Sequence, residues 1–171
     1  MDYNYLYRKL NGRTPLKNDC GKLCNNACCV DTDGETLGMY LFPGEEVMFD
    51  GKSNFTYEES ELTYCGKKAK ILYCKPYCNR QERPLACRIF PLFPYITISG
   101  DLKIIVDPRG RSMCPLYKGE VTDLNSGFVR GVRHIGEILM EDEETYEFLF
   151  ELSRLIDEEV NQIVGNLQKF I

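Results

Sequence analysis

Residues 20–29 read CGKLCNNACC, which gives four cysteines in ten positions: Cys20, Cys24, Cys28 and Cys29. A second cysteine-rich stretch, CKPYCNRQERPLACR, covers residues 74–88. The chain of 171 residues has nine cysteines and one histidine, and all nine cysteines lie between positions 20 and 114. Thiols at this density are bonded either to one another or to a metal, so that choice decides how this half of the chain folds.

Three features favour metal ligation over a disulfide framework. The first residues, MDYNYLYRKL, lack the apolar segment of a secretory signal. An odd number of cysteines leaves one thiol without a disulfide partner in a single chain. A chain of this length can also bury a core of its own, whereas disulfide-dense domains are usually much shorter. We therefore expect a cytoplasmic protein with metal-binding cysteines; a mature secreted chain whose signal has been removed is the alternative.

Composition narrows the classes of partner. The formal net charge of −5 and the pI near 5.1 disfavour a general nucleic-acid-binding protein, which would usually be basic. No apolar run approaches the length that spans a bilayer. We expect metal ions as ligands, with no nucleic acid and no membrane as partner, and one domain over residues 1–171.

Residues 11–118 form the expected cysteine-cluster region, because they contain all eight prolines and all nine cysteines. Turn signals are frequent there and helical periodicity is poor. Two short hairpins are predicted, one around Gly66-Lys67 and one around Gly100-Asp101. Their strands are expected at residues 61–65 with 69–73, and at residues 95–99 with 102–106. A short helix is predicted over residues 43–49.

Residues 120–171 contain no proline and no cysteine and predict a helical segment. Apolar residues at a spacing of three or four indicate one amphipathic helix through Phe128, Val132, Ile135 and Leu139. A second, longer helix is predicted after a break near Glu141, with apolar positions from Tyr146 to Leu167. The expected fold class is therefore α+β: an irregular cysteine-rich region with short β-hairpins, followed by an antiparallel helix pair whose apolar stripes pack on each other.

The spacing of the cysteines is compatible with metal binding but does not distinguish zinc from an iron–sulfur cluster. Four thiolates suit either Zn²⁺ or an iron–sulfur cluster, and eight thiols would fill two four-ligand sites. Cys20–Cys24, Cys24–Cys28 and Cys74–Cys78 are CxxxC pairs, which share a face on a helical turn. Cys28 and Cys29 would point to opposite sides of an extended chain, which would suit two neighbouring metals.

Cations near the second cluster support thiolate ligands. From Tyr64 to Arg88 there are seven basic residues and one acid, and nearby positive charge lowers the pKa of thiols. We expect Arg83 and Arg88 to lie beside the ligands, with Arg88 substantially buried and hydrogen-bonded to the backbone. His134 sits in the helical segment and is not expected to be a ligand.

The two stretches CGKLCNNACC and CKPYCNRQERPLACRIFP together resemble the YkgJ-type cysteine-cluster family, whose domain is described as zinc- or iron-chelating. That family has a cysteine cluster, then a cysteine before Arg-Pro, then Cys-Arg and a proline; here Cys78, Arg83-Pro84, Cys87-Arg88 and Pro91 stand at those positions. The first cluster departs from the family by one extra residue in each gap. The resemblance covers residues 20–116, and with the spacing it gives these expected ligands: Cys20, Cys24, Cys28, Cys29, Cys74, Cys78, Cys87 and Cys114.

Three functions follow as expectations. The first is a metal-binding protein whose Zn²⁺ is largely structural. The alternative is a protein with a [4Fe-4S] or other iron–sulfur cluster that has a redox or electron-transfer role. The resemblance adds a protein-modifying enzyme, such as one like the lysine N-methylases, but the chain has no Gly-rich dinucleotide fingerprint and we lean against catalysis. Cys65 is expected to be the leftover thiol.

Overall fold

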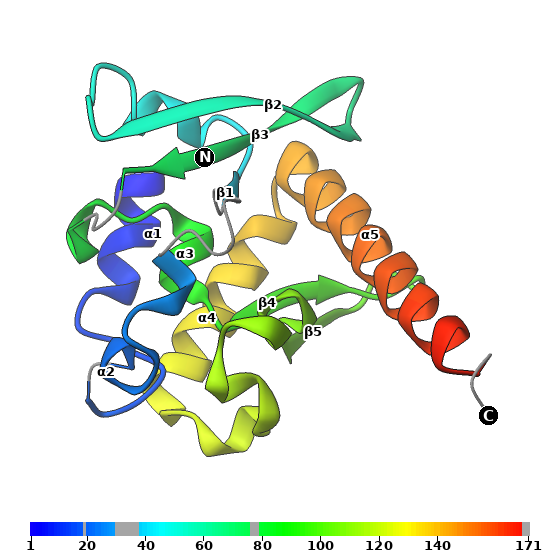
Figure 1. Cartoon of the computed structure of the whole chain (residues 1–171). Helices are drawn as coiled ribbons and strands as arrows, with labels where there is room; N and C mark the ends of the chain where they lie inside the picture. The colour runs from blue at the N-terminus through cyan, green and yellow to red at the C-terminus, as the bar shows by residue number, and fades with distance from the viewer. Residues whose placement is uncertain (19, 30–37, 76–78, 169–171) are drawn as a thin grey trace.

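The computed structural model describes residues 1–18, 20–29, 38–75 and 79–168 of the chain. It confirms the mixed α+β class, with antiparallel sheets in the first part and two helices at the C-terminal end. Figure 1 shows the larger sheet at one end of the molecule, the smaller hairpin near its middle and the last helix leading away to the C-terminus.

The larger sheet has three antiparallel strands in the order β1-β3-β2. Their bounds are β1 Gly38–Leu41, β2 Phe55–Tyr64 and β3 Lys67–Cys74. The first expected hairpin is therefore present, but β2 is longer than predicted and the turn falls on Cys65 and Gly66. Both turn residues have positive φ, 46° and 71°, as a tight two-residue turn requires.

The second hairpin pairs β4, Leu92–Ile96, with β5, Leu102–Val106. The first strand ends three residues earlier than predicted, because Thr97 begins the turn. Its Oγ1 accepts a hydrogen bond of 3.0 Å from the Asp101 amide, and its own amide donates to the Asp101 carbonyl at 2.9 Å. Gly100 supplies the positive φ of 85° that this turn needs.

Helices α4, Ser126–Met140, and α5, Glu143–Gln168, match the two predicted helices. Asn125 caps α4 by accepting from the Gly127 amide at 2.9 Å, and Asp142 accepts from the Thr145 amide at 3.0 Å at the start of α5. In Figure 1, α4 runs toward the three-stranded sheet and α5 runs back away from it. As expected, these helices pack on each other; both also pack on the β4–β5 hairpin, and α5 packs on β2.

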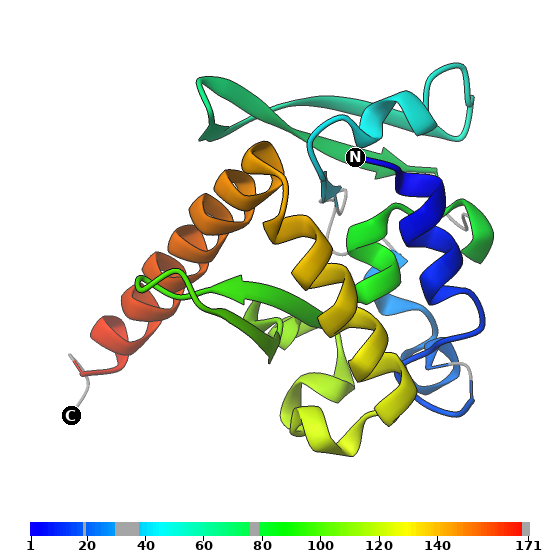
Figure 2. The ribbon, with the colours of Figure 1, turned by 180° about the vertical axis from the view of Figure 1, so that it is seen from behind.

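Buried residues from both halves of the chain form one core. Phe148 of α5 is fully buried and makes edge contacts with three rings, at centroid distances of 5.3 to 6.4 Å: Tyr40, Phe42 and Tyr64. Helix α1, Tyr3–Leu10, adds Leu6 and Leu10 to the same core and lies beside α3 and α4 (Figure 2). Helix α3 contributes Leu85 and Ile89, on either side of Cys87, to the same core.

Short helices and 3-10 turns surround this core. They are α2 Gly21–Cys24, η1 Ala27–Cys29, η2 Glu45–Met48, η3 Arg80–Glu82, α3 Leu85–Ile89, η4 Pro108–Ser112, η5 Pro115–Lys118 and η6 Val121–Asp123. Three of them, α2, η1 and α3, contain cysteines. The predicted helix after Pro43 is thus a 3-10 turn. Among the described residues, no helix has both the length and the apolar character needed to cross a bilayer.

Candidate metal centre

Two adjoining cavities gather the cysteines. The first, of about 170 Å³, is lined by Cys28, Cys29, Cys74 and Cys87. The second, of about 30 Å³, is lined by Cys20, Cys24, Cys28 and Cys114. Both cavities include Cys28, Phe90 and Met113 in their walls. Seven of the eight expected ligands therefore lie around one region of the molecule, and the eighth, Cys78, falls outside the described residues.

The first cysteine segment folds back on itself. Helix α2 ends at Cys24, and Asn25 and Asn26 follow in the left-handed region with φ of 51° and 56°. The 3-10 turn η1 then places the Sγ atoms of Cys28 and Cys29 at 3.9 Å from each other. Sulfur ligands of one tetrahedral zinc, each about 2.3 Å from the metal, are about 3.8 Å apart.

This arrangement differs from what the extended chain predicted for Cys28 and Cys29. Their opposed directions hold for a strand, but η1 is a tight helical turn and brings the two sulfurs to the same side. The pair has the spacing of two ligands to one metal.

Cys74 and Cys87 line the first cavity from two elements, a strand and a short helix. Cys74 is the last residue of β3, where it pairs with Phe55 of β2. Cys87 lies in α3, which begins directly after Pro84. Proline fixes its own φ and disfavours helix in the preceding residue, so the sequence Arg83-Pro84 sets where this helix starts.

Cys114 is positioned by the loop after β5. The Asp107 carboxylate accepts from the Arg109 amide at 3.0 Å and forms a two-pronged ion pair with its guanidinium, at 2.9 and 2.6 Å. Gly110 lets this loop approach Phe90, since a Cβ there would lie 2.9 Å from the ring and 3.5 Å from the Cys114 Cβ. Burial raises the pKa of the Cys114 thiol; a backbone hydrogen bond at Leu116 opposes this, and the nearby thiols of the second cavity raise the pKa further.

Arg88 is half-buried and hydrogen-bonded to the backbone, as expected. Its Nε donates to the Arg83 carbonyl at 2.7 Å and its Nη2 to the Gln81 carbonyl. The guanidinium carbon lies 4.1 Å from the centroid of the Tyr7 ring. Arg83 lines the second cavity beside Cys20 and Cys24. That both arginines support bound metal remains a prediction.

Sequence reasoning missed Glu45, which ties together the elements around Cys87. The side chain is fully buried and accepts three hydrogen bonds: from Tyr7 Oη at 2.5 Å, from the Leu85 amide at 2.6 Å and from the Phe42 amide at 3.1 Å. Burial raises its pKa to about 7, although these bonds and Arg88 favour the charged form. The signal in the sequence was an acid directly after Pro43-Gly44, which we interpreted only as a helix start.

Cys65 and His134 lie apart from the two cavities. Cys65 is exposed in the β2–β3 turn, where partial desolvation and then the carboxylates of Glu147, Glu143 and Glu144 raise the pKa of its thiol. His134 is an exposed residue of α4, with Nδ1 at 3.7 Å from the Glu137 carboxylate. Neither residue lines either cysteine cavity.

The fit to a metal rests on donor chemistry and on the Cys28–Cys29 spacing. Within the described ranges, no three or more His, Cys, Asp or Glu side chains are arranged around a common point as ligands of one ion. The thiols supply the soft donors that zinc and iron–sulfur clusters require. The walls add apolar groups and the Asp107–Arg109 pair.

Comparison of the chain with protein-family models, with curated proteins and with solved structures finds no match in any of the three. The resemblance to the cysteine-cluster family therefore stays a prediction from the quoted motifs.

Proposed function

We propose that this protein binds zinc through clustered cysteine thiolates and that the metal has a largely structural role. The observation that carries the proposal is the convergence of seven cysteines, from segments up to 94 positions apart in sequence (Cys20 to Cys114), on two cavities with a shared wall. Cys28, common to both, is the thiolate best placed to serve either group or to bridge them. Cys78 is the proposed eighth ligand.

A structural role fits the elements that carry these cysteines. The single turns α2, η1 and η5, which contain or adjoin Cys20, Cys24, Cys28, Cys29 and Cys114, bury no apolar side chain of their own, so bound metal would supply part of their folding free energy. Each thiol that becomes a ligand gives up its proton, and Arg83, which lines the second cavity, is a cation near the resulting negative charge. A site closed by four cysteines leaves no open position for a substrate.

An iron–sulfur cluster is the second candidate, because the same four-thiolate groups would hold one. The two metals differ in colour and in redox activity, since zinc is neither coloured nor redox-active.

The experiment that tests the assignment of ligands is metal retention in single cysteine variants. Cys114→Ser removes a thiol from the second cavity and Cys74→Ser one from the first, while Cys65→Ser removes the exposed thiol outside both. We expect the first two variants to lose metal to a chromogenic chelator faster than the wild type, and Cys65→Ser to match the wild type. Equal retention in all four proteins would contradict the proposal.

A further inference from the structure

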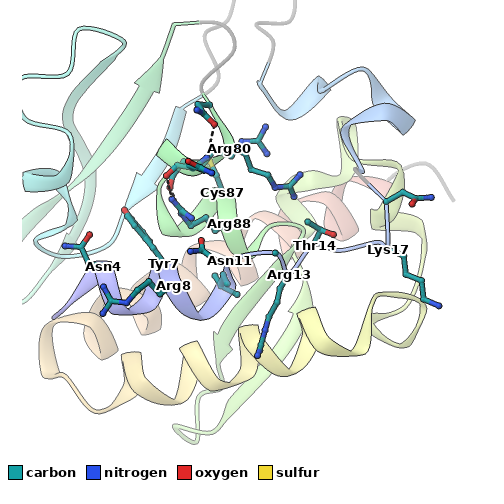
Figure 3. Close-up of a pocket in the computed structure, with 16 residues that line it drawn as sticks. Asn4, Tyr7, Arg8, Asn11, Arg13, Thr14, Lys17, Arg80, Cys87 and Arg88 are labelled. Atoms are coloured by element: carbon teal, nitrogen blue, oxygen red, sulfur yellow. Dashed lines mark hydrogen bonds between the residues drawn. The ribbon is translucent and has the colours of Figure 1, made fainter.

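A third cavity, of about 890 Å³, lies between α1, the loop that follows it and the segment of residues 79–88 (Figure 3). Six of its 16 described lining residues are cationic, and none of these 16 is acidic; the cations are Arg8, Arg13, Lys17, Arg80, Arg83 and Arg88. We propose that this cavity is a binding site for a small phosphorylated ligand that carries two or more phosphate groups.

The concentration of positive charge runs against the composition of the chain. The protein has a net charge of −5, yet six of its 21 basic residues line one cavity. Arg8 and Lys17 are exposed and form no ion pair with any described residue. Arg13 lies against Gly131 of α4, and its Nη1 is 3.5 Å from the Gly127 carbonyl. The positive charges of Arg8 and Lys17 are therefore not offset by any described carboxylate, and a bound polyanion would supply that counter-charge.

Arg88 gives the site a fixed guanidinium. Two of its five N–H groups donate to backbone carbonyls, and its plane lies over Tyr7, so the side chain is held in place before a ligand binds. Glu45 is fully buried, accepts a hydrogen bond from Tyr7 and does not line the cavity. Three N–H groups of Arg88 remain to meet an anion, in the fork geometry that suits phosphate.

The rest of the wall indicates the size and kind of ligand. Four asparagines, one glutamine and one threonine add neutral hydrogen-bonding groups: Asn4, Asn11, Asn18, Asn79, Gln81 and Thr14. Leu10 is the one aliphatic residue with a branched side chain in the lining, so charged and hydrogen-bonding side chains outnumber aliphatic ones in the wall. The volume lies within the range of small-molecule sites. Phosphate groups place the most negative charge and the most acceptor oxygens in such a volume.

The site adjoins the cysteine cavities but does not depend on them. Cys87 and Arg83 line this cavity as well as one of the cysteine cavities, whereas the exposed cations Arg8, Arg13 and Lys17 line this one alone. Variants of Arg8 and Lys17 can therefore test the phosphate site with the proposed metal ligands intact.

The test is isothermal titration calorimetry of the full chain at low salt with inorganic pyrophosphate as the probe. Citrate and a single-stranded DNA 12-mer serve as comparison ligands. The variants are Arg8→Ala, Lys17→Ala and the double variant; the matched controls are Arg133→Ala and Lys103→Ala, which remove exposed cations outside the cavity. Circular dichroism confirms that each variant is folded.

We expect saturable binding of pyrophosphate to the wild type, weaker binding at higher salt and a loss of roughly three- to fivefold in affinity for each cavity variant. The double variant should lose more, and both controls should bind like the wild type. The proposal is overturned if pyrophosphate does not bind, if the cavity variants bind like the controls, or if citrate or the DNA binds as tightly as pyrophosphate.

Discussion

Glu45→Gln is the substitution whose effect can be worked out most fully. An ordinary glutamate titrates near 4.5, whereas burial raises the pKa of Glu45 to about 7. The folded state therefore binds a proton more tightly than the unfolded state. A difference of one in pKa corresponds to about 1.4 kcal/mol. The protonated carboxyl therefore adds about 3 kcal/mol to the unfolding free energy below pH 4.5, and this contribution is lost as the pH rises through 7.

Glutamine does not titrate, so it removes this pH dependence, and it lowers the unfolding free energy by an amount that is the same at every pH. Its amide oxygen can accept from Tyr7 and the Leu85 amide, but its NH₂ group then faces the Phe42 amide, where the carboxylate accepts a bond of 3.1 Å. A buried N–H left without an acceptor costs about 1–3 kcal/mol at any pH. The variant should be less stable than the wild type at pH 5, and the difference in unfolding free energy should shrink by about 2–3 kcal/mol at pH 8.

Urea unfolding of both proteins at pH 5 and pH 8, followed by circular dichroism, measures this difference directly. Glu59→Gln is the control, because Glu59 is exposed on β2, and it should retain the pH dependence of the wild type. A Glu45→Gln protein whose stability changes with pH as much as that of the wild type would refute the reasoning.

Three further substitutions test the core and the cysteine cavities. Phe148→Ala removes a fully buried ring and should lower the unfolding free energy, measured in urea, by about 3–5 kcal/mol. Its control is Ile98→Ala, at a side chain that is 97% exposed, which should change the unfolding free energy by less than about 0.5 kcal/mol. Equal effects of the two substitutions would be inconsistent with the described core. Gly110→Ala places a Cβ 2.9 Å from the Phe90 ring, so we expect the unfolding free energy to fall by about 1–3 kcal/mol and bound metal to be lost faster. Metal retention equal to that of the wild type would show that the Phe90 contact does not position Cys114. Arg88→Lys loses the planar fork that donates to two carbonyls, and we expect weaker metal retention against a chelator; retention equal to that of the wild type would remove Arg88 from the support of the site.

The helices and hairpins could be predicted because their signals are local. The apolar spacing through Phe128 and Leu139 defines α4, and the Gly66 and Gly100 turns mark both hairpins. Helix α1 was missed, although Asp2 caps it and its basic residues lie at its end, because the segment was considered only as a possible signal. Strand β1 is four residues long and has no partner nearby in sequence, so its pairing with β3 carries no local signal.

The candidate sites also have some features that the sequence predicts and others that depend on the fold. The cysteines could be singled out by residue type and density alone. Their distribution over two cavities could not, because it depends on how α3 and the loop after β5 pack around Phe90. The cationic cavity was invisible for the same reason: Arg8 and Arg88 are 80 positions apart and come together only when α1 packs beside α3.

Elemental analysis combined with an absorption spectrum, on wild-type protein purified without oxygen, tests the central claim most directly. The account predicts zinc bound to the protein, without iron, and a spectrum with no visible bands. If the protein contains iron and absorbs visible light, the bound group is an iron–sulfur cluster and not zinc. Protein without stoichiometric metal of either kind would contradict metal binding altogether.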